Sequence, residues 1–268
     1  MKATDLSPGQ LFDLTAKVAV VTGGARGLGR ALSEGLAQAG ADVVVASRKL
    51  ENCRVAADEI ERSTGRRALP LACHVGKWDD CRRLIDSVIE HFGRIDVFVN
   101  NAGMSPMYTS LVDLSEELYD KTFAVNLKGP FRLSCLAADQ MAAAGGGSII
   151  NISSIGSQGG GGGGGGAARG AGVALPYACA KAGLNVLTVG LSQAYAPEVR
   201  VNAVLAGSFW TDASKHWPEG MVDRNRIPLG RVADPTEMVG TVTYLASDAS
   251  SYTTGALLRV DGGVAARA

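Results

Sequence analysis

Apolar residues along the chain gather in short runs that alternate with stretches of helical periodicity. Runs rich in β-branched residues predict strands, which we place at residues 17–22, 42–46, 68–73, 95–99, 148–152, 199–204 and 257–260. The stretches between them predict helices over residues 30–39, 51–63, 79–92, 115–141, 177–195 and 235–247. The helix over 115–141 should bend near Gly129 and Pro130, because proline disrupts a helix interior.

This alternation of strands and helices predicts repeated strand–helix–strand units. Such units form a parallel sheet with right-handed crossovers and helices on both faces. The strands at 17–22 and 42–46 are apolar almost throughout, as expected for strands that are covered on both sides. The predicted fold class is therefore α/β, with a doubly wound parallel sheet of about seven strands. No linker or shift in composition divides residues 1–268, so we expect a single domain with a core over 14–263.

A glycine-rich stretch interrupts this pattern between the fifth predicted strand and the helix that follows it. Residues 159–166 are eight consecutive glycines within an inserted loop over 156–176. Ordering backbone costs about 1–2 kcal/mol per residue, so neither a helix nor a strand is expected there. The loop is either a passive insertion, which surface loops accept readily, or a flexible lid or an oligomer contact. Deleting residues 160–166 would distinguish these alternatives.

Charge and composition narrow the possible partners. The 26 basic residues balance the 26 acidic ones, so no overall positive field attracts nucleic acid or anionic lipid, and neither is expected as a partner. No apolar stretch reaches membrane-spanning length, and Asp5, Pro8 and Gly9 interrupt the start of the chain, which argues against a signal peptide. Five cysteines without paired spacing suit a reducing compartment, so we expect a cytoplasmic protein. Three scattered histidines predict no metal site.

A glycine-rich turn follows the first predicted strand. Residues 22–29 read TGGARGLG and lead into the first long helix. Glycines allow backbone to approach a pyrophosphate, and a helix N-terminus offers free N–H groups with a partial positive charge. The alternative is a tight turn without a ligand. The candidate cofactor-binding residues here are Gly23, Arg26, Gly27, Leu28 and Gly29.

The end of the second predicted strand bears on which nicotinamide cofactor binds. An acidic residue at this place holds the ribose 2′-hydroxyl of NAD, but here the chain reads Ser47 and Arg48. Arg48, and Arg26 from the glycine turn, can pair with a 2′-phosphate through their planar guanidinium groups. This favours NADP(H) over NAD(H). The alternative is that both arginines are ordinary solvated surface residues.

A candidate catalytic group lies in the second half of the chain. Tyr177 and Lys181 are four residues apart at the start of a predicted helix, so they share a face. A free tyrosine has a pKa near 10, and a neighbouring cation should lower it enough for acid–base work. Ser154, at the end of its strand, can hydrogen-bond a substrate oxygen. Ser153 competes for this role, and alternation along a strand lets only one of the two face the site.

Taken in order, these motifs resemble the short-chain dehydrogenase/reductase family. The resemblance rests on TGxxxGxG at 22–29, NNAG at 100–103, Asn126, Ser154 with YxxxK at 177–181, and VDGG at 260–263, and it covers about Leu14 to Gly263. It implies a Rossmann-type fold and hydride transfer between NADP(H) and a carbonyl or secondary alcohol of a small substrate. Tyr177 would be the general acid or base and Lys181 would also grip the nicotinamide ribose. Ser154 would hold the substrate oxygen and Asn126 a relay water.

The resemblance implies further cofactor contacts. His74 and Val75 match the adenine edge, although many relatives carry Asp where His74 stands. The segment that would lie against the adenine-side ribose is Asn101, Ala102 and Gly103, where Asn101 could equally be structural. The nicotinamide would meet Gly207, Phe209 and Thr211, besides Tyr177 and Lys181. Ala206 replaces a proline common in relatives, which relaxes that turn.

Substrate and assembly are less defined by the sequence. Residues 208–232 would form a substrate lid, whose aromatic and apolar residues either line a pocket or pack the lid on the body: Phe209, Trp210, His216, Trp217 and Met221. The substrate class stays open between 3-oxoacyl thioesters and sugar acids or small ketones. Relatives imply a homotetramer, or a homodimer. A catalytically silent cofactor-binding regulator is the alternative function, but Asn126, Ser154, Tyr177 and Lys181 are all present.

Overall fold

Seven parallel strands form one sheet at the centre of the computed structural model, which describes residues 7–106, 108, 110–159, 174–211, 214 and 227–266. The strands follow the spatial order β3-β2-β1-β4-β5-β6-β7. Their bounds are β1 (Val18–Thr22), β2 (Asp42–Ser47), β3 (Ala68–Ala72), β4 (Val97–Asn100), β5 (Gly147–Ser154), β6 (Val199–Ala206) and β7 (Leu257–Val260). The predicted doubly wound, seven-stranded parallel sheet is confirmed.

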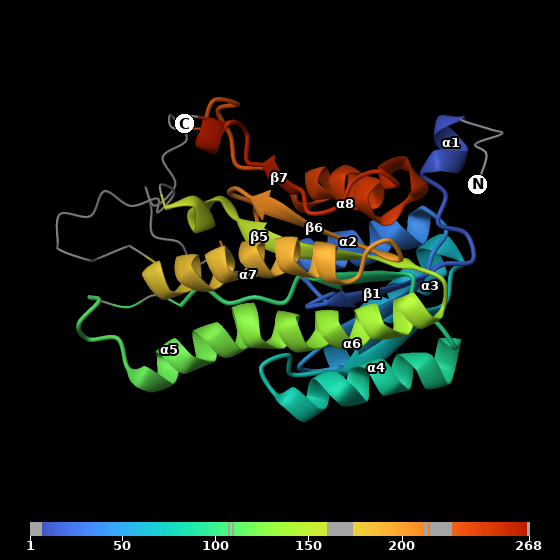
Figure 1. Cartoon of the computed structure of the whole chain (residues 1–268), viewed down its shortest axis with the longest axis horizontal. Coiled ribbons are helices and arrows are strands. Elements are labelled where there is room, and N and C mark those ends of the chain that lie inside the picture. Colours follow the sequence, from blue (N-terminus) through green and yellow to red (C-terminus); the bar gives the residue numbers. More distant parts are fainter. Residues whose placement is uncertain are drawn as a thin grey trace.

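Helices cover both faces of this sheet (Figure 1). They are α1 (Pro8–Leu11), α2 (Gly27–Gln38), α3 (Leu50–Thr64), α4 (Trp78–Phe92), α5 (Glu116–Phe123), α6 (Gly129–Ala143), α7 (Leu175–Ala194) and α8 (Val239–Ala246). Helices α2, α3 and α8 share one apolar cluster with the sheet, while α4, α6 and α7 share the cluster on the other face. The short α1 was not predicted from the sequence.

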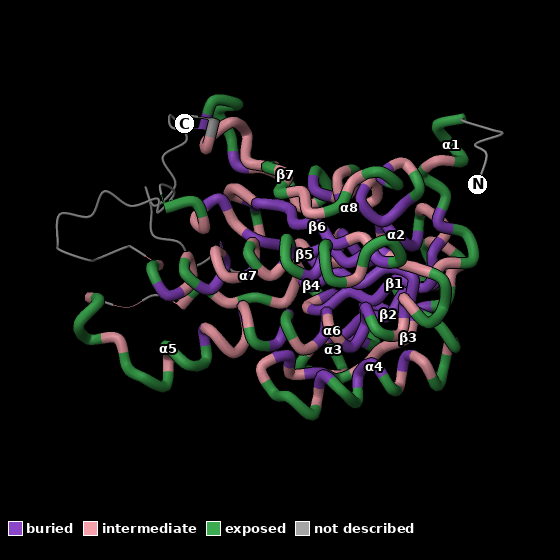
Figure 2. Tube along the Cα trace, viewed as in Figure 1, coloured by how far each residue is buried: buried purple, intermediate pink, exposed green. Residues whose placement is uncertain are grey.

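The core consists of two apolar layers separated by the sheet. Along β1 and β2 every apolar residue is buried, and neighbouring residues contribute to opposite clusters: Ala19 and Val21 pack toward α2, Val18 and Val20 toward α4. Figure 2 shows this burial concentrated in the central strands. The expectation that these strands are covered on both faces is therefore confirmed.

The long predicted helix over 115–141 is interrupted. A π-helical turn over Ala124–Lys128 separates α5 from α6, so the bend begins before Gly129 and not at Pro130 (Figure 1). A Cβ on Gly129 would lie 2.3 Å from the Val75 carbonyl oxygen, so glycine is needed where α6 meets the β3–α4 loop. Pro130 occupies the first turn of α6, where its missing N–H costs nothing.

Smaller differences lie at element ends. Strand β5 continues to Ser154, two residues beyond the predicted end, because it pairs with β6 over its whole length. The predicted helix over 235–247 begins as a 3₁₀ turn, Pro235–Met238, whose N-cap Asp234 accepts from the Thr236 N–H. The strand order reverses between β1 and β4, and in such sheets ligands bind beyond the carboxyl ends of the strands at this point.

Parts of two predicted segments lie outside the described residues. In the inserted loop over 156–176 these are residues 160–173, which include most of the glycine run. In the predicted lid over 208–232 they are residues 212, 213 and 215–226, which include His216, Trp217 and Met221. Within the part of the chain that the structure covers, no helix has the length and apolar character needed to cross a bilayer.

Candidate active site

The glycine-rich turn joins β1 to α2 as predicted. Gly23 adopts φ +66°, and a Cβ on Gly29 would lie 2.2 Å from the Gly23 carbonyl oxygen, so the turn closes only with glycine at both places. Helix α2 begins at Gly27 after the extended residue Arg26, and no side chain caps it. Its first N–H groups therefore face outward without an internal partner, which suits a bound phosphate. The residues present thus fit a nucleotide cofactor.

Thr22 and Asn101 connect the ends of β1 and β4 beneath this turn. The Thr22 hydroxyl oxygen accepts from the N–H groups of Asn101 (3.0 Å) and Ala102 (3.1 Å). The Asn101 side-chain amide donates to the Thr22 carbonyl oxygen at 2.9 Å. These contacts match the alternative in which Asn101 has a structural role and ties the ends of neighbouring strands together. The role of Thr22 was not predicted from the sequence, because its partners lie on another strand; Val99, to which its hydroxyl donates, is 77 residues away along the chain.

The end of β2 carries the candidate residues for a 2′-phosphate. Arg26 and Arg48 are both exposed, and neither forms an ion pair with any described residue. The Ser47 hydroxyl lies 3.1 Å from the thiol of Cys53, a fully buried residue that donates to the Leu71 carbonyl oxygen at 3.4 Å. Burial raises the pKa of the Cys53 thiol, so it stays protonated. The end of β2 thus presents the Ser47 hydroxyl, which contacts Cys53, and two arginine side chains that form no ion pair with the described residues.

His74 and Val75 follow β3 on the same edge of the sheet. The His74 Nδ1 accepts from the Gly76 N–H at 3.2 Å, and the His74 N–H donates to the Asp80 carboxylate at 3.1 Å. Val75 is buried, and its carbonyl oxygen accepts from the Cys81 thiol at 3.2 Å. The imidazole is therefore turned onto its own loop and stabilises the loop that would border the adenine.

Ser154 and Tyr177 are brought together by β5 and α7. Their side chains share a hydrogen bond, and the Ser154 hydroxyl also accepts from the Gly156 N–H at 3.1 Å. Ser153 points the other way, is buried, and donates to the Asn185 side chain at 2.6 Å. The structure therefore places Ser154, and not Ser153, beside Tyr177, in agreement with the alternation of side chains along a strand.

Lys181 is almost completely buried, with 3% of its surface exposed. Its Nζ donates to the Ile152 carbonyl oxygen at 2.7 Å and lies 5.7 Å from the centroid of the Tyr177 ring. Burial favours the neutral amine and lowers the pKa of Lys181 to about 8. The lysine is thus held against the face of the tyrosine ring.

The expected lowering of the Tyr177 pKa by Lys181 is not found. Burial raises the pKa of Tyr177 above its ordinary value, and only the hydrogen bond with Ser154 opposes this. The physical reason is that both groups sit in a poorly solvated site, where burial disfavours the charged form of each. The Lys181 ammonium also gives a hydrogen bond to Ile152 and faces the ring, which weakens its effect on the phenol oxygen.

Asn126 lies on the π-helical turn and is fully buried. Its Oδ1 accepts from the Met104 N–H at 3.2 Å, and its Nδ2 donates to the carbonyl oxygens of Met104 (2.8 Å) and Thr122 (2.9 Å). The side chain therefore holds the loop after β4 against the helix. A Cβ on Gly103 would lie 3.1 Å from the Asn126 Oδ1 and 3.7 Å from the Lys181 Nζ, so all three residues border the same space.

The nicotinamide-side residues follow β6. A Cβ on Gly207 would lie 2.6 Å from the Cα of Asp261, so glycine is required at this crossing. Phe209 is buried and bridges to Ala233, while the Thr211 N–H donates to the Ser214 hydroxyl at 2.7 Å. Phe209 thus packs into the body of the protein. This was one of the two alternatives for the aromatic residues of the predicted lid, the other being that they line a pocket.

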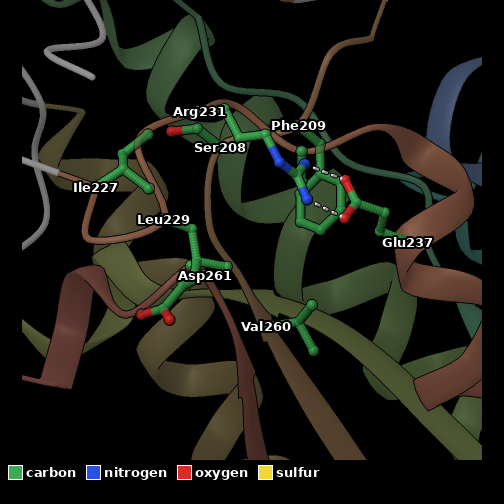
Figure 3. Close-up of a pocket in the computed structure, with 10 residues that line it drawn as sticks. Ser208, Phe209, Ile227, Leu229, Arg231, Glu237, Val260 and Asp261 are labelled. Atoms are coloured by element: carbon green, nitrogen blue, oxygen red, sulfur yellow. Dashed lines mark hydrogen bonds and ion pairs between the residues drawn. The ribbon is translucent and has the colours of Figure 1, made fainter. Parts of the chain in front are cut away.

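A cavity of about 140 Å³ lies at the carboxyl ends of β6 and β7 (Figure 3). Arg231 and Glu237 form a two-pronged ion pair at 2.6 Å on its wall, which lowers the pKa of Glu237 to about 2. The cavity is lined by Ser208, Phe209, Ile227, Leu229, Arg231, Ala233, Glu237, Val260, Asp261 and Gly262. The four candidate catalytic residues are not among them.

Sequence reasoning missed three hydrogen-bonding residues around the site. Tyr108, in the loop after β4, accepts through its hydroxyl from the Leu175 N–H at the start of α7 (2.9 Å). Asn185 and Ser157 form a hydrogen bond at 2.8 Å next to Ser154. The only local signal was that Asn185 lies four residues after Lys181, on the same face of the helix. Among the described residues, no group of three His, Cys, Asp or Glu is placed to hold a metal ion.

A glycine-rich turn before a helix and a Ser–Tyr–Lys group at one edge of a doubly wound sheet are the arrangement expected of a nicotinamide-dependent oxidoreductase. A family model described as enoyl-(acyl carrier protein) reductase matches residues 23–265. The chain belongs to the short-chain dehydrogenase/reductase family. Members of this family use NAD(P).

Similar proteins span nearly the whole chain. The dehydrogenase/reductase SDR family member 4 of Caenorhabditis elegans is 34% identical over 259 residues, 94% of this chain and 96% of that protein. L-Rhamnose 1-dehydrogenase (NAD(P)(+)) of Azotobacter vinelandii is 36% identical over 259 residues, 94% of this chain and 97% of that protein. The structure of NADPH-dependent 3-quinuclidinone reductase from Rhodotorula rubra has a TM-score of 0.84 and 30% identity, covering 98% of this chain and 97% of that one.

Proposed function

We propose that this oxidoreductase moves a hydride between NADP(H) and a carbonyl or secondary alcohol of a small substrate, with Tyr177 as general acid and base. The observation that carries this proposal is the hydrogen bond between Ser154 and Tyr177, with Lys181 buried against the tyrosine ring at the edge where the glycine turn lies. The arrangement provides one proton donor, one group to hold an oxygen, and one cation within a poorly solvated site.

Residues of this chain would carry out the proton transfer to and from the substrate oxygen. Burial raises the pKa of Tyr177, so its hydroxyl is protonated at neutral pH and can protonate the alkoxide that develops in reduction. Ser154 holds the substrate oxygen at the correct place for that transfer. In oxidation Tyr177 must first lose its own proton. The tyrosinate, which a charged Lys181 beside it would stabilise, then takes the proton of the alcohol. The nicotinamide, when bound, supplies or accepts the hydride.

The proposed cofactor site runs along the carboxyl edge of the sheet. The pyrophosphate would lie on Gly23, Gly27, Leu28 and Gly29, the adenosine on Ser47, Arg48, His74, Val75, Asn101, Ala102 and Gly103, and the nicotinamide on Tyr177, Lys181, Gly207, Phe209 and Thr211. The preference for NADP(H) over NAD(H) is supported by exposed Arg26 and Arg48 beside the Ser47 hydroxyl, with no carboxylate at the end of β2. The name of one structural relative, an NADPH-dependent reductase, also supports it, whereas the name of the rhamnose dehydrogenase includes both cofactors.

Replacing Tyr177 with Phe tests the mechanism. We expect turnover to fall by about 100-fold to 10,000-fold, the contribution typical of a positioned acid or base, while NADPH still binds. Activity would be followed by NADPH absorbance with a panel of 3-oxoacyl thioesters, sugar acids and small ketones, and binding by NADPH fluorescence. The matched control is Tyr195→Phe, at the other end of α7, which should leave turnover unchanged. Near-normal turnover in Tyr177→Phe would exclude this mechanism.

Replacing Arg48 with Asp tests the cofactor preference. A carboxylate there should repel a 2′-phosphate and favour a 2′-hydroxyl, so the ratio of Kd for NADPH to Kd for NADH should rise at least tenfold, or about 1.4 kcal/mol. Arg54→Asp, at an exposed position near the start of α3, is the control and should not change the ratio. A wild-type preference for NADH, or an unchanged ratio in Arg48→Asp, would contradict the proposal.

We further propose a cytoplasmic homotetramer, with a homodimer as the alternative, formed by one domain of 268 residues. Apolar side chains exposed on the long helices support assembly, among them Tyr119 on α5, Phe131 on α6 and Val186 on α7. The substrate class is left to the panel above.

A further inference from the structure

We infer that Asn185 is a positioning residue that holds Ser154 at the correct place relative to Tyr177 and Lys181. This inference rests on the function proposed above. Asn185 lies on α7, one turn beyond Lys181, and its side chain reaches the end of β5 on both sides of Ser154. It touches neither substrate nor cofactor in this proposal and acts only through its hydrogen bonds.

The hydrogen bonds around Asn185 form a directed chain. The Ser153 hydroxyl donates to the Asn185 Oδ1 at 2.6 Å, and the Asn185 Nδ2 donates to the Ser157 hydroxyl oxygen at 2.8 Å. The Ser157 hydroxyl in turn donates to the Ser154 carbonyl oxygen at 2.6 Å. The Asn185 amide therefore accepts from Ser153, the residue before Ser154. It donates to Ser157, which in turn binds the Ser154 main chain. A side-chain amide offers a donor and an acceptor on separate atoms, as this arrangement requires.

These hydrogen bonds act as a brace at the point where the pairing of β5 with β6 ends. Strand β5 ends at Ser154, and a 3₁₀ turn of four residues, Ile155–Gln158, follows it. Such short turns have poor hydrogen-bond geometry and do not fix a position by themselves. In the sequence the glycine run begins directly after this turn, at residue 159. Asn185 therefore ties the turn after β5 to the helix that carries Tyr177 and Lys181.

The consequence for catalysis follows from distance. Ser154 forms the hydrogen bond that opposes the rise of the Tyr177 pKa, and it would hold the substrate oxygen. A shift of about 1 Å in a catalytic group can cost about 100-fold in rate. A loosened Ser154 should therefore lower kcat and raise the apparent pKa of Tyr177, while the glycine turn and the end of β2, which bind the cofactor, stay in place.

Two variants remove one arm of the brace from opposite sides. Asn185→Asp keeps the acceptor for Ser153 but, when ionised, cannot donate to Ser157. Ser157→Ala removes the same hydrogen bond from its other end, together with the hydrogen bond from the Ser157 hydroxyl to the Ser154 carbonyl oxygen, at a partly buried position. Each should lower kcat about tenfold with the Kd for NADPH unchanged. The double variant should be no worse than Ser157→Ala alone, because that change already removes the hydrogen bond that Asn185→Asp breaks.

The pH profile separates positioning from general loss of stability. Loss of the Ser154 hydrogen bond should shift the limb of the kcat–pH profile that reports Tyr177 to higher pH in both variants. Thr188→Val is the matched control: it removes another buried hydrogen bond between α7 and β5, from the Asn151 Nδ2 at 2.9 Å, one turn farther along α7. It should lower the melting temperature and leave kcat and the pH profile unchanged.

The outcomes are distinct. A wild-type kcat and pH profile in folded Ser157→Ala or Asn185→Asp would overturn the inference. So would an equal loss of kcat in Thr188→Val, because the effect would then be general. If Asn185→Asp does not fold, Ser157→Ala decides alone. Retained turnover in Tyr177→Phe would instead overturn the proposed function, whatever the result for Asn185.

Discussion

Lys181 shows how one buried side chain couples catalysis to stability. Among the described residues its ammonium donates to one partner, the Ile152 carbonyl oxygen, and it has almost no contact with solvent, so folding disfavours its charged form. The pKa falls from an ordinary value of 10.5 to about 8. Between these two pH values the unfolded chain binds the proton more tightly than the folded one, so the folded state gains stability as the pH rises.

Replacing Lys181 with Met should remove this gain. For the protein without cofactor, the free energy of unfolding should rise by roughly 2 kcal/mol between pH 7 and pH 9.5 from this group alone, and that rise should be absent in Lys181→Met. Urea unfolding across this pH range measures it. Tyr177 does not obscure the result, because its raised pKa lies above the range. Parallel pH profiles for the two proteins would contradict the argument.

At the residue level the sequence indicated which residues form the candidate site, but it said less about the surroundings of their side chains. The spacing of Tyr177 and Lys181 predicted a shared helix face, and alternation along β5 allowed only one of Ser153 and Ser154 to face the tyrosine; both follow from local geometry. The direction of the Tyr177 pKa shift was wrong, because desolvation depends on the whole surrounding fold. The contacts of Asn185 and Thr22 join segments that are far apart along the chain, so no local pattern announces them.

The junction of α6 with the β3–α4 loop is the most constrained feature at the scale of elements. The π-helical turn shifts α6 so that its first residue, Gly129, lies directly on the Val75 main chain. Strands were predicted well because runs of β-branched residues specify them locally. The π-helical turn was not predicted. It adds one residue to a single turn, and the helices before and after it each keep the ordinary apolar spacing.

Replacing Gly129 with Ala should separate α6 from this loop. The added Cβ would meet backbone at 2.3 Å, which cannot move aside as a side chain does, so we expect a loss of about 1–3 kcal/mol in stability. NADPH should also bind more weakly, because Val75 belongs to the proposed adenine edge. Thermal unfolding and NADPH titration measure both effects.

The matched control for this change is Gly190→Ala on α7, where no atom lies within 4 Å of the added Cβ. Alanine forms helices better than glycine by about 1 kcal/mol, so this variant should be unchanged or more stable. If both variants behave alike, close packing at Gly129 is not what requires glycine there.

For the whole molecule, the two faces of the sheet are covered but several helices leave apolar side chains uncovered on the outside. On α7, Val186 has 74% of its surface exposed and Val189 has 38%. The topology was predictable from the alternation of elements, since parallel strands require crossovers of one hand. The assembly follows only from family resemblance, because a monomer sequence does not distinguish a solvated valine from one that a second subunit covers.

A charged residue on α7 should disrupt the proposed assembly. Light scattering should give the wild type a mass of about four times 27.6 kDa, or twice this value for the alternative dimer. Val186→Glu should reduce the mass, because burying an unpaired carboxylate in an interface is strongly unfavourable. Val55→Glu, which changes an exposed valine on α3, is the control and should not change it. A monomeric wild type would refute the proposal.

The hydrogen bonds from Asn185 to Ser157 and from Leu175 to Tyr108 stand on either side of residues 160–173. The described residues on both sides of that stretch are thus fastened to the body of the protein. Because the closure entropy of a loop grows only slowly with its length, by about 0.6 kcal/mol for each doubling, the stretch can be exchanged as a cassette. Protein engineers therefore have a place to graft new sequences beside Tyr177 without redesigning the catalytic helix.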